Sequence, residues 1–541
     1  MQKAGETDVP RSATPHVVSA RDRKYDRQLR LWAANGQAAL EEAHVVLLTA
    51  SAAGAETLKN LVLPGTGSFT VVDDKLTTEE DVDVNFFLDE SSIGHPRAAK
   101  VAEFLQELNT DSVGRFESLT LSEFDKLDPS YWEKYSLVVA HQIRPSVLLP
   151  ISKVLWDKKI PLVIINSIGF YARLRIVTPE HTVVESHPES TVDLRLDCPW
   201  PELERFAFGI ELDGLSEMDH AHVPYLALLL IYLKQWKDAH GGSPPSTYAE
   251  KKEFKALIKT GVRSSDAENF DEAINTVWRA TQATTIPSNS QAILNDDRAQ
   301  NLSPSTSKFW ILARAISDFT KSPSSGGHLP LSGTLPDMKA DTTSYIKLQS
   351  IYRSKALEDR DWVASRVSEL LLSLGRPADA ISSDEVDTFC KFSRNLVVFD
   401  GRSLEEEYTP STARAKKILQ ELEEENSLMS VYVGFRAVEV FEEREKRYPG
   451  TVEEVDEDEK VLKEIALEIV GSLGGTEVNE RTASVLKEFV RYGGGELHNI
   501  SSLLGGIAAQ EIVKLITRQY VPMTNTTIFD GIQSSSAVWE L

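Results

Sequence analysis

Cysteine is scarce in this sequence, whose 541 residues include only Cys198 and Cys390. Two thiols this far apart in the chain do not provide a disulfide framework or a zinc-binding cysteine cluster. No His-Glu-x-x-His motif or comparable ligand spacing is present, so the sequence predicts no bound metal. A chain with few cysteines suits a reducing compartment, and we expect a cytoplasmic and/or nuclear protein.

Surplus positive charge and long apolar runs are also lacking. The sequence has 58 Lys and Arg against 82 Asp and Glu, a formal net charge of −24, which argues against nucleic acid or an anionic membrane as a partner. The most apolar run, Tyr225–Leu233, has 9 residues, far fewer than the ~20 that span a bilayer. It predicts a buried helix. The first residues contain no apolar segment typical of a signal peptide.

The chain is too long for one compact core, and its sequence pattern divides it into four segments. Residues 1–24 predict a mobile N-terminal tail. Residues 25–178 and 491–541 predict the two parts of one α/β domain. Between them, residues 179–490 predict a mainly helical insertion, punctuated by loops rich in Gly, Ser and Pro.

In the first α/β segment, short apolar runs alternate with helical patterns such as AAKVAEFLQELN, which indicates a mostly parallel sheet. We expect ARLRIVTP and HTVVESHP to leave this sheet as a pair of strands. Near the C-terminus, a helix with a close-packing point at Gly505 and Gly506, followed by a strand, is predicted to return to the α/β domain. The predicted strands of the first segment are Val45–Leu48, Phe69–Val72, Leu137–Ala140 and Leu162–Ile165.

Glycine is missing where the first strand and helix meet. A dinucleotide-binding turn reads GxGxxG, because a Cβ atom would obstruct both the tight turn and the approaching phosphate. Here the six positions from Thr49 to Gly54 read TASAAG. The remaining Gly54 occupies the position that usually allows close helix-to-strand packing, and the acidic residue expected ~20 residues further on is present as Asp73. The scaffold is retained while the phosphate position is filled.

The segments around this turn resemble the adenylating fold of the enzymes that activate ubiquitin and its relatives. The resemblance rests on KYDRQLRLWAANGQAALEEAHVVLL, AGAETLKNLVLPGTGSFTVVDD, NFFLDESSIGHPRAAKVAEFLQELN and the C-terminal LLGGIAAQEIVKLITRQYVP. The fold that it implies is α/β, Rossmann-like and of the ThiF/MoeB adenylation type in a degenerate form. Middle segments, among them RLRIVTPEHTVVESHP, SKFWILARAISDF and LPLSGTLPDMKADTTSYIKLQ, resemble one branch more narrowly. This branch comprises the regulatory subunits of heterodimeric activating enzymes of the neddylation pathway.

The resemblance implies a disabled ATP site. The Arg-Gln pair of catalytic members falls on about Val84 and Asn85, and their magnesium-binding Asp falls near Gln142. This chain would therefore bind no cofactor, and ATP and magnesium would lie on the partner subunit. Catalytic members also keep glycines at the positions of Thr49, Ser51 and Ala52.

One residue implies a positive role. Arg27 in YDRQLRLW matches an arginine that reaches, in this family, across the dimer into the ATP site of the partner. Arg30 is a second candidate that we interpret as structural. Neither Cys198 nor Cys390 lies in the family's active-cysteine motif, so we expect the thioester cysteine on the partner. The implied partners are that cysteine-bearing subunit and a ubiquitin-like modifier.

Two other functions stay open on the sequence. A self-contained nucleotide-dependent enzyme is disfavoured, because Cβ atoms at the close-approach positions would obstruct ATP and NAD alike. A scaffold or adaptor that uses a nucleotide-free Rossmann-like fold to bind proteins remains possible if Arg27 has no catalytic effect. Within the family, the regulatory subunit of the sumoylation enzyme is disfavoured because the helical insertion here is too long. The sequence predicts no autonomous enzyme activity.

Overall fold

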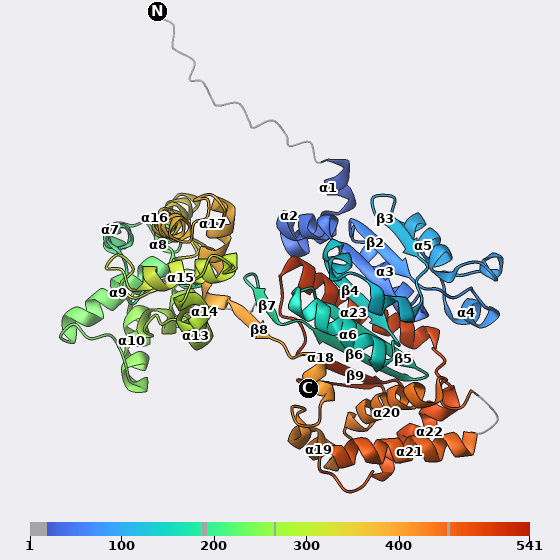
Figure 1. Cartoon of the computed structure of the whole chain (residues 1–541). Helices are drawn as coiled ribbons and strands as arrows, with labels where there is room; N and C mark the ends of the chain where they lie inside the picture. The colour runs from blue at the N-terminus through green and yellow to red at the C-terminus, as the bar shows by residue number, and fades with distance from the viewer. Residues whose placement is uncertain (1–18, 187–191, 265–266, 452–454) are drawn as a thin grey trace, which may run out of the picture. The chain divides into compact units, whose positions relative to one another are not determined.

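The computed structural model describes residues 19–186, 192–264, 267–451 and 455–541. Contacts divide the chain into two compact units, of which unit 1 comprises Met1–His181 and Phe399–Leu541 and unit 2 comprises Thr182–Val398 (Figure 1). This division differs from the predicted insertion over residues 179–490, since residues 399–490 belong to unit 1. Of the predicted mobile tail, residues 1–18 lie outside the described residues, whereas Ala20–Lys24 form helix α1.

Unit 1 is built on an 8-stranded sheet with the strand order β10-β9-β6-β5-β4-β1-β2-β3. Neighbours among β1 to β5 pair in parallel, and β6, β9 and β10 join through antiparallel pairs. The strands are β1 His44–Leu48, β2 Ser68–Val72, β3 Val113–Glu117, β4 Leu137–His141, β5 Leu162–Ile168, β6 Tyr171–Val177, β9 Thr526–Asp530 and β10 Ser535–Trp539.

The four predicted apolar strands correspond to β1, β2, β4 and β5, which confirms the mostly parallel sheet. The predicted pair of departing strands is wrong, because β6 pairs with both β5 and β9 and lies inside the sheet. The strand after it, β7 (Glu180–Val183), pairs instead with β8 (Val397–Asp400) in a separate two-stranded sheet. Strand β3 was not predicted, because its sequence VGRFE forms a partly exposed edge without an apolar run.

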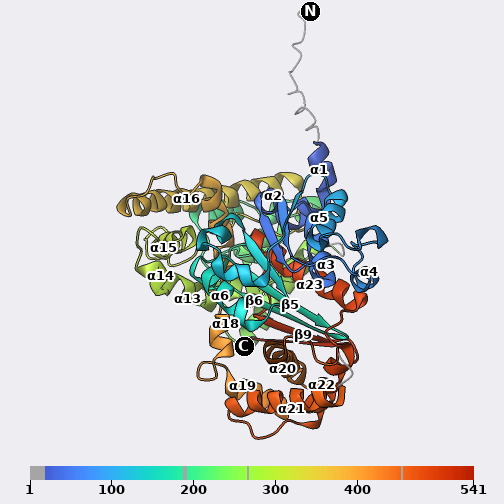
Figure 2. The ribbon, with the colours of Figure 1, turned by 45° about the vertical axis from the view of Figure 1, so that its right-hand side comes forward.

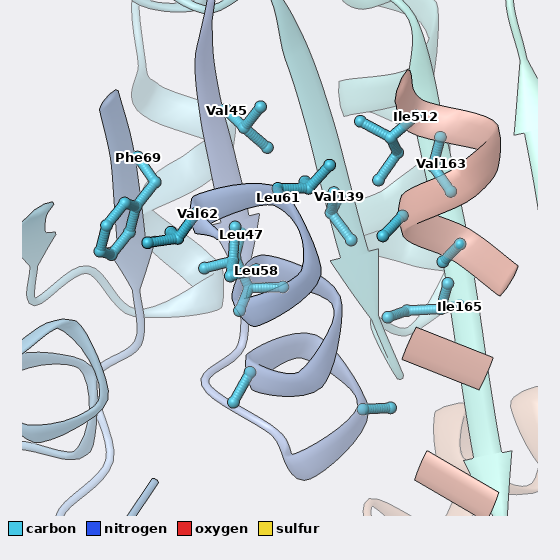
Figure 3. Packing of buried hydrophobic residues seen from close by; sticks show 14 of the residues in the cluster. Val45, Leu47, Leu58, Leu61, Val62, Phe69, Val139, Val163, Ile165 and Ile512 are labelled. Atoms are coloured by element: carbon cyan, nitrogen blue, oxygen red, sulfur yellow. The ribbon is translucent and has the colours of Figure 1, made fainter. Parts of the chain in front are cut away.

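Side chains alternate between the two faces of the sheet along each strand. Because the central strands are continuous apolar runs, both faces of the large sheet are apolar. Val45, Leu47 and Phe69 face a cluster that contains Leu58 of α3 and Ile512 of α23 (Figure 3). The opposite face packs mainly on α6, and α20, α21 and α22 pack beside β6, β9 and β10 (Figure 2). The α-helices of unit 1 that follow α1 are α2 Asp26–Glu42, α3 Ala52–Val62, α4 Glu79–Val84, α5 Arg97–Leu108, α6 Pro145–Asp157, α18 Leu404–Tyr408, α19 Ala415–Glu423, α20 Met429–Glu445, α21 Val455–Ser472, α22 Glu480–Tyr492 and α23 His498–Thr517.

Helix α23 is the closing helix that the sequence predicts. By length and composition alone it could cross a membrane, but 61% of its most apolar window is buried inside the protein. A Cβ atom on Gly505 would lie 2.6 Å from Cβ of Glu56 on α3, whereas one on Gly506 would meet nothing within 4 Å. Close packing is thus confirmed for Gly505 and wrong for Gly506. Strand β9 then returns to the sheet beside β6.

Buried ion pairs explain why residues 399–490 belong to unit 1. Arg175 of β6 donates through Nε to Oε2 of Glu407 at 2.5 Å, and both side chains are almost fully buried. Arg173 of the same strand pairs with Glu439 of α20. A buried charge is costly unless it is paired, so α18 and α20 must remain against β6 to satisfy these two arginines. Local sequence patterns do not show such long-range pairs.

Unit 2 is helical within its described residues, apart from the short strands at its two ends. The predicted buried helix is confirmed as α9, in which Leu226, Leu228 and Leu229 are fully buried. The helices are α7 Pro201–Phe208, α8 Glu217–His220, α9 Tyr225–Ala239, α10 Tyr248–Thr260, α11 Glu268–Asn275, α12 Trp278–Thr281, α13 Ser288–Asn295, α14 Asp297–Gln300, α15 Lys308–Thr320, α16 Thr342–Ser373 and α17 Ser383–Phe392.

Candidate functional site

The turn between β1 and α3 keeps the shape of a glycine turn without its glycines. Thr49 has a φ of 76°, in the left-handed region that β-branched residues rarely adopt. Its backbone N–H donates to the carbonyl of Val72 on β2 at 2.9 Å, which holds the residue in place. Ser51 then caps α3, since its hydroxyl accepts the N–H of Gly54 at 3.0 Å. The turn thus has a left-handed residue directly after β1 and a capped helix start shortly after that residue.

Gly54 has the packing role predicted for it. A Cβ atom at this position would lie 2.7 Å and 2.8 Å from the two Cδ atoms of Leu47 on β1. Real Cβ atoms do not approach other atoms this closely, so glycine allows α3 to lie directly on the strand.

A carboxylate of the chain occupies the first turn of α3, where a nucleotide phosphate binds in proteins with an intact loop. The backbone N–H of Ala52 donates to Oε2 of Glu496 at 2.9 Å, and the N–H of Ala53 donates to Oε1 at 3.0 Å. Glu496 lies in the loop between α22 and α23, far along the chain from α3. Each carboxylate oxygen thus satisfies one of the free N–H groups that begin a helix.

Two further groups complete the surroundings of Glu496. His141, the last residue of β4, is fully buried, and its Nε2 lies 3.4 Å from Oε1 of Glu496. The hydroxyl of Ser501 donates to the same oxygen at 3.1 Å. Burial by itself raises the pKa of Glu496, but His141 and the N–H groups of Ala52 and Ala53 outweigh it and the net shift of the pKa is downward. The site therefore favours a negative charge, and the chain supplies it.

Asp73, the residue expected to bind a ribose, is also engaged by the protein itself. Its Oδ2 accepts the N–H of Ala50 at 2.8 Å and both Nε and Nη2 of Arg97, at 2.9 and 2.6 Å. Its Oδ1 accepts the N–H of Lys75 at 3.0 Å. Burial lowers the pKa of Arg97, but the carboxylates of Asp73 and Asp81 outweigh it and the net shift of the pKa is upward. Asp73 is therefore buried and already accepts hydrogen bonds from Ala50, Arg97 and Lys75, which disfavours a contact with a ribose hydroxyl.

The other positions that the resemblance assigns to the ATP site lack the necessary chemistry. Gln142 follows β4 with a φ of 46°, and its Nε2 donates to the carbonyl of Ser167 at 2.9 Å. Val84 ends α4 as an apolar residue. Asn85 is buried, and its Oδ1 accepts the N–H of Phe87 at 3.0 Å. Taken together, the residues present do not fit a nucleotide or its magnesium ion.

Arg27 lies on the exposed part of α2, and within residues 19–186, 192–264, 267–451 and 455–541 no hydrogen bond or ion pair involves its side chain. Arg30, one turn further along the helix, pairs with Asp26 at 2.9 Å. The structure does not support the simpler interpretation that Arg27 pairs with a nearby carboxylate. The local ion pair of Arg30 agrees with a structural interpretation of that residue.

The two thiols lie in settings that disfavour a thiolate. Cys390 is buried, which raises the pKa of its thiol. Partial burial, together with the charge of Asp197, raises the pKa of Cys198 to about 11, although the imidazole Nε2 of His328 lies 3.6 Å from its sulfur. A thioester nucleophile needs a lowered pKa, so neither cysteine suits that role. Across the described residues, no group of three or more His, Cys, Asp and Glu side chains is placed to hold a metal ion.

Sequence reasoning missed Glu496 and His141. The Glu follows three glycines, Gly493 to Gly495, and the His ends an otherwise apolar strand, so each has a weak local signal. Their pairing joins the end of β4 to a loop that lies far away in the sequence, and no motif of the turn itself indicates it.

Comparison with known proteins identifies the family. The model of the ThiF family matches residues 25–540, and the chain belongs to that family. Within it, the chain belongs with the NEDD8-activating enzyme E1 regulatory subunits. The Xenopus laevis protein of that name is 43% identical, and the match covers 97% of this chain and 99% of that protein. Those of Danio rerio and Gallus gallus are 39% and 40% identical, over 97% and 98% of this chain and 99% and 100% of theirs.

Among solved structures, Escherichia coli MccB with AMPCPP and MccA is 17% identical with a TM-score of 0.26. That match covers 30% of this chain and 51% of the MccB chain.

Proposed function

We propose that this chain is the regulatory subunit of a heterodimeric enzyme that activates the ubiquitin-like modifier NEDD8. The proposal rests on similarity over nearly the whole length of relatives that bear this name. The catalytic partner holds ATP, magnesium and the thioester cysteine. It adenylates the C-terminal carboxylate of the modifier and then forms the thioester. This chain binds no nucleotide and acts in the cytoplasm and/or nucleus.

The observation that carries the non-catalytic role is the position of Glu496. A nucleotide phosphate and this carboxylate would compete for the same N–H groups of Ala52 and Ala53, and two anions cannot share them. The ribose position is likewise taken, because Asp73 is bound to Arg97. Isothermal titration of ATP and magnesium into the isolated chain is therefore expected to give no saturable heat. Micromolar binding would contradict a filled site.

Arg27 gives this subunit a direct part in the reaction. Negative charge builds on the phosphates of ATP as the carboxylate of the modifier attacks the α-phosphate. A guanidinium offers fixed, paired donors to such oxygens, and it acts best when no carboxylate of its own chain engages it. Arg27 on α2 is exposed and has no hydrogen-bond or ion-pair partner among the residues that the structure describes, so it meets that requirement. It would complete the ATP site of the partner in trans.

A scaffold or adaptor is the second candidate function. A nucleotide-free Rossmann-like fold can assemble the enzyme without contacting ATP, and every observation on Glu496 and Asp73 is compatible with that role. The two functions differ in whether Arg27 changes the rate of adenylation.

The distinguishing experiment measures ATP–pyrophosphate exchange by the reconstituted heterodimer at saturating ATP. Arg27→Ala is expected to slow exchange at least about tenfold, since the loss of one preorganised donor to a developing anion typically costs about 10²–10³ in rate. Arg27→Lys is expected to restore exchange in part, because an ammonium cannot make a two-point contact. Arg30→Ala is the matched control, since it removes the same charge from the same helix.

Assembly is checked by size-exclusion chromatography for every variant. Normal assembly with slow exchange for Arg27→Ala, and normal exchange for Arg30→Ala, supports the role in trans. Wild-type exchange by Arg27→Ala leaves the scaffold as the function. Equal losses in both variants indicate a general effect of positive charge on α2 and contradict a specific contact.

A further inference from the structure

We propose that Glu496 is an internal ligand of an anion-binding position that the start of α3 has retained, and that removing its carboxylate opens this position to inorganic phosphate. The inference concerns this chain alone and does not depend on the proposed function. It assigns a binding site to a loop that the sequence describes as disabled.

The first support is the arrangement of donors at the start of α3. This helix has 11 residues, and the positive end of its dipole points toward the carboxylate of Glu496. The contact is bidentate, with one oxygen on each of two successive N–H groups, at 2.9 and 3.0 Å. Successive N–H groups at a helix start also form the usual binding site for a phosphate in Rossmann-like folds. The donors have been kept although the glycines have not.

The second, independent support is His141. Its side chain is fully buried, and neither ring nitrogen has good hydrogen-bond geometry to any atom of the described residues. Its ion-pair partner is the carboxylate of Glu496, 3.4 Å from Nε2. Because buried polar groups without a partner are rare, removal of this carboxylate would leave His141 facing a vacated position that attracts an anion. Helix dipole and imidazole come from different elements, α3 and β4, and both face the same carboxylate.

The loop that carries Glu496 is built to place this carboxylate. Gly494 has a φ of 80°, and a Cβ atom there would lie 2.4 Å from Cγ of Tyr448. The carbonyl of Gly495 accepts the N–H of Gly169 at 2.8 Å, which ties the loop to the end of β5. Ser501, in the first turn of α23, donates to Oε1 of Glu496. The loop is therefore held on both sides of Glu496, and its side chain can be removed without releasing the backbone.

The occupant favoured for the vacated site is a small tetrahedral oxyanion. The donors are N–H groups, a hydroxyl and an imidazole, all of which can serve phosphate oxygens. A cation would face the positive end of a helix, and an apolar molecule would leave the N–H groups unsatisfied. Inorganic phosphate is the smallest probe that tests this chemistry without the ribose, which the Asp73–Arg97 pair excludes.

The test compares the thermal unfolding of the full chain in phosphate and in chloride at equal ionic strength. Glu496→Ala is expected to lower the Tm in chloride and to regain part of that loss as phosphate is added, with saturation. The wild type is expected to show only the general stabilisation that phosphate gives to folded proteins, which rises without saturation. Glu425→Ala is the matched control, because Glu425 is an exposed carboxylate elsewhere in unit 1, and it should show no saturable response to phosphate beyond that of the wild type.

Two more variants keep the test decisive. Glu496→Ser also removes the carboxylate but leaves a small polar side chain in its place, so it serves if the alanine variant does not fold, and it should respond to phosphate in the same direction. Adding His141→Ala to either variant should raise the phosphate concentration at half-maximal response at least about tenfold. The imidazole is one of the two groups that would face the anion, the other being the start of α3. The proposal is overturned if folded Glu496→Ala or Glu496→Ser ignores phosphate, or if the wild type responds equally.

Discussion

Substituting two adjacent glycines of α23 tests the contact that brings the closing helix onto the candidate site. Gly505 and Gly506 lie in the same helix and differ only in their surroundings. A Cβ atom on Gly505 would lie 2.8 Å from the backbone C of Glu56 and 2.8 Å from the backbone N of Thr57. Backbone atoms of a packed helix cannot rotate away. A Cβ atom on Gly506 would meet nothing within 4 Å.

The expected effects on the free energy of unfolding have opposite signs. Replacing glycine by alanine inside a helix stabilises it by about 1 kcal/mol, and this term is common to both variants. Gly506→Ala should therefore gain about 1 kcal/mol. Gly505→Ala also suffers overpacking, which typically costs about 1–3 kcal/mol, and a clash with backbone lies at the upper end. The helix term cancels in the comparison, so the two variants should differ by about 3 kcal/mol.

The assay is differential scanning calorimetry of the full chain, followed by hydrogen–deuterium exchange of peptides from α3 and α23. The calorimetric transition of unit 1 should rise by about 2 °C for Gly506→Ala and fall by several degrees for Gly505→Ala. Exchange should accelerate in α3 of the Gly505 variant, since α23 covers it. Equal transition temperatures for the two variants would show that the close contact between these helices does not exist.

Three further predictions concern particular side chains. Thr49→Gly should stabilise the chain by up to about 1 kcal/mol, because glycine relieves a left-handed conformation that costs about 1–2 kcal/mol, and Thr49→Ala should give no gain in the same calorimetric measurement because its Cβ remains. Replacing Cys198 and Cys390 together by serine should leave thioester formation by the reconstituted heterodimer intact; a folded double variant without thioester in a non-reducing gel would place the nucleophile on this chain. Burial raises the pKa of Glu442 from 4.5 to about 7, against the opposing charge of Arg144, so the stability from its protonated form is full below about pH 4.5 and is lost as the pH rises through about 7. Glu442→Gln should therefore match the wild type in free energy of unfolding near pH 4 and exceed it at pH 8, by at most about 3.5 kcal/mol for a shift of about 2.5 pKa units at about 1.4 kcal/mol each, and a constant difference across this range would contradict the assigned titration.

The parts of the fold that the sequence predicted well are those with a strong local pattern. Strands β1, β2, β4 and β5 are buried on both faces, so their sequences are continuous apolar runs. The packing role of Gly54 was predicted correctly because it depends only on nearby residues. These are Ser51, one helical turn away, and Leu47 in the preceding strand. Edge strand β3 escaped because half-exposed positions carry no such pattern.

The features that were missed depend on residues far apart in the chain. The sequence shows that the phosphate position lacks glycine, but not that Glu496 occupies it, since a carboxylate after three glycines has no local preference for a distant helix. The contact-defined bounds of unit 2 differ from the predicted insertion for a similar reason. Residues 399–490 are as helical as unit 2, and their place beside the sheet is set by Glu407 and Glu439, which pair with the arginines of β6.

The short sheet of β7 and β8 affects how many residues can be inserted into or deleted from unit 2. The chain leaves unit 1 through β7 and returns through β8, and the two strands are hydrogen-bonded neighbours. The ends of the inserted segment are therefore about 4.8 Å apart, one strand spacing. Residues can be added to or removed from the interior of unit 2 without moving either end and without changing the register of the large sheet. A whole helical unit is thus inserted into the chain between two paired strands.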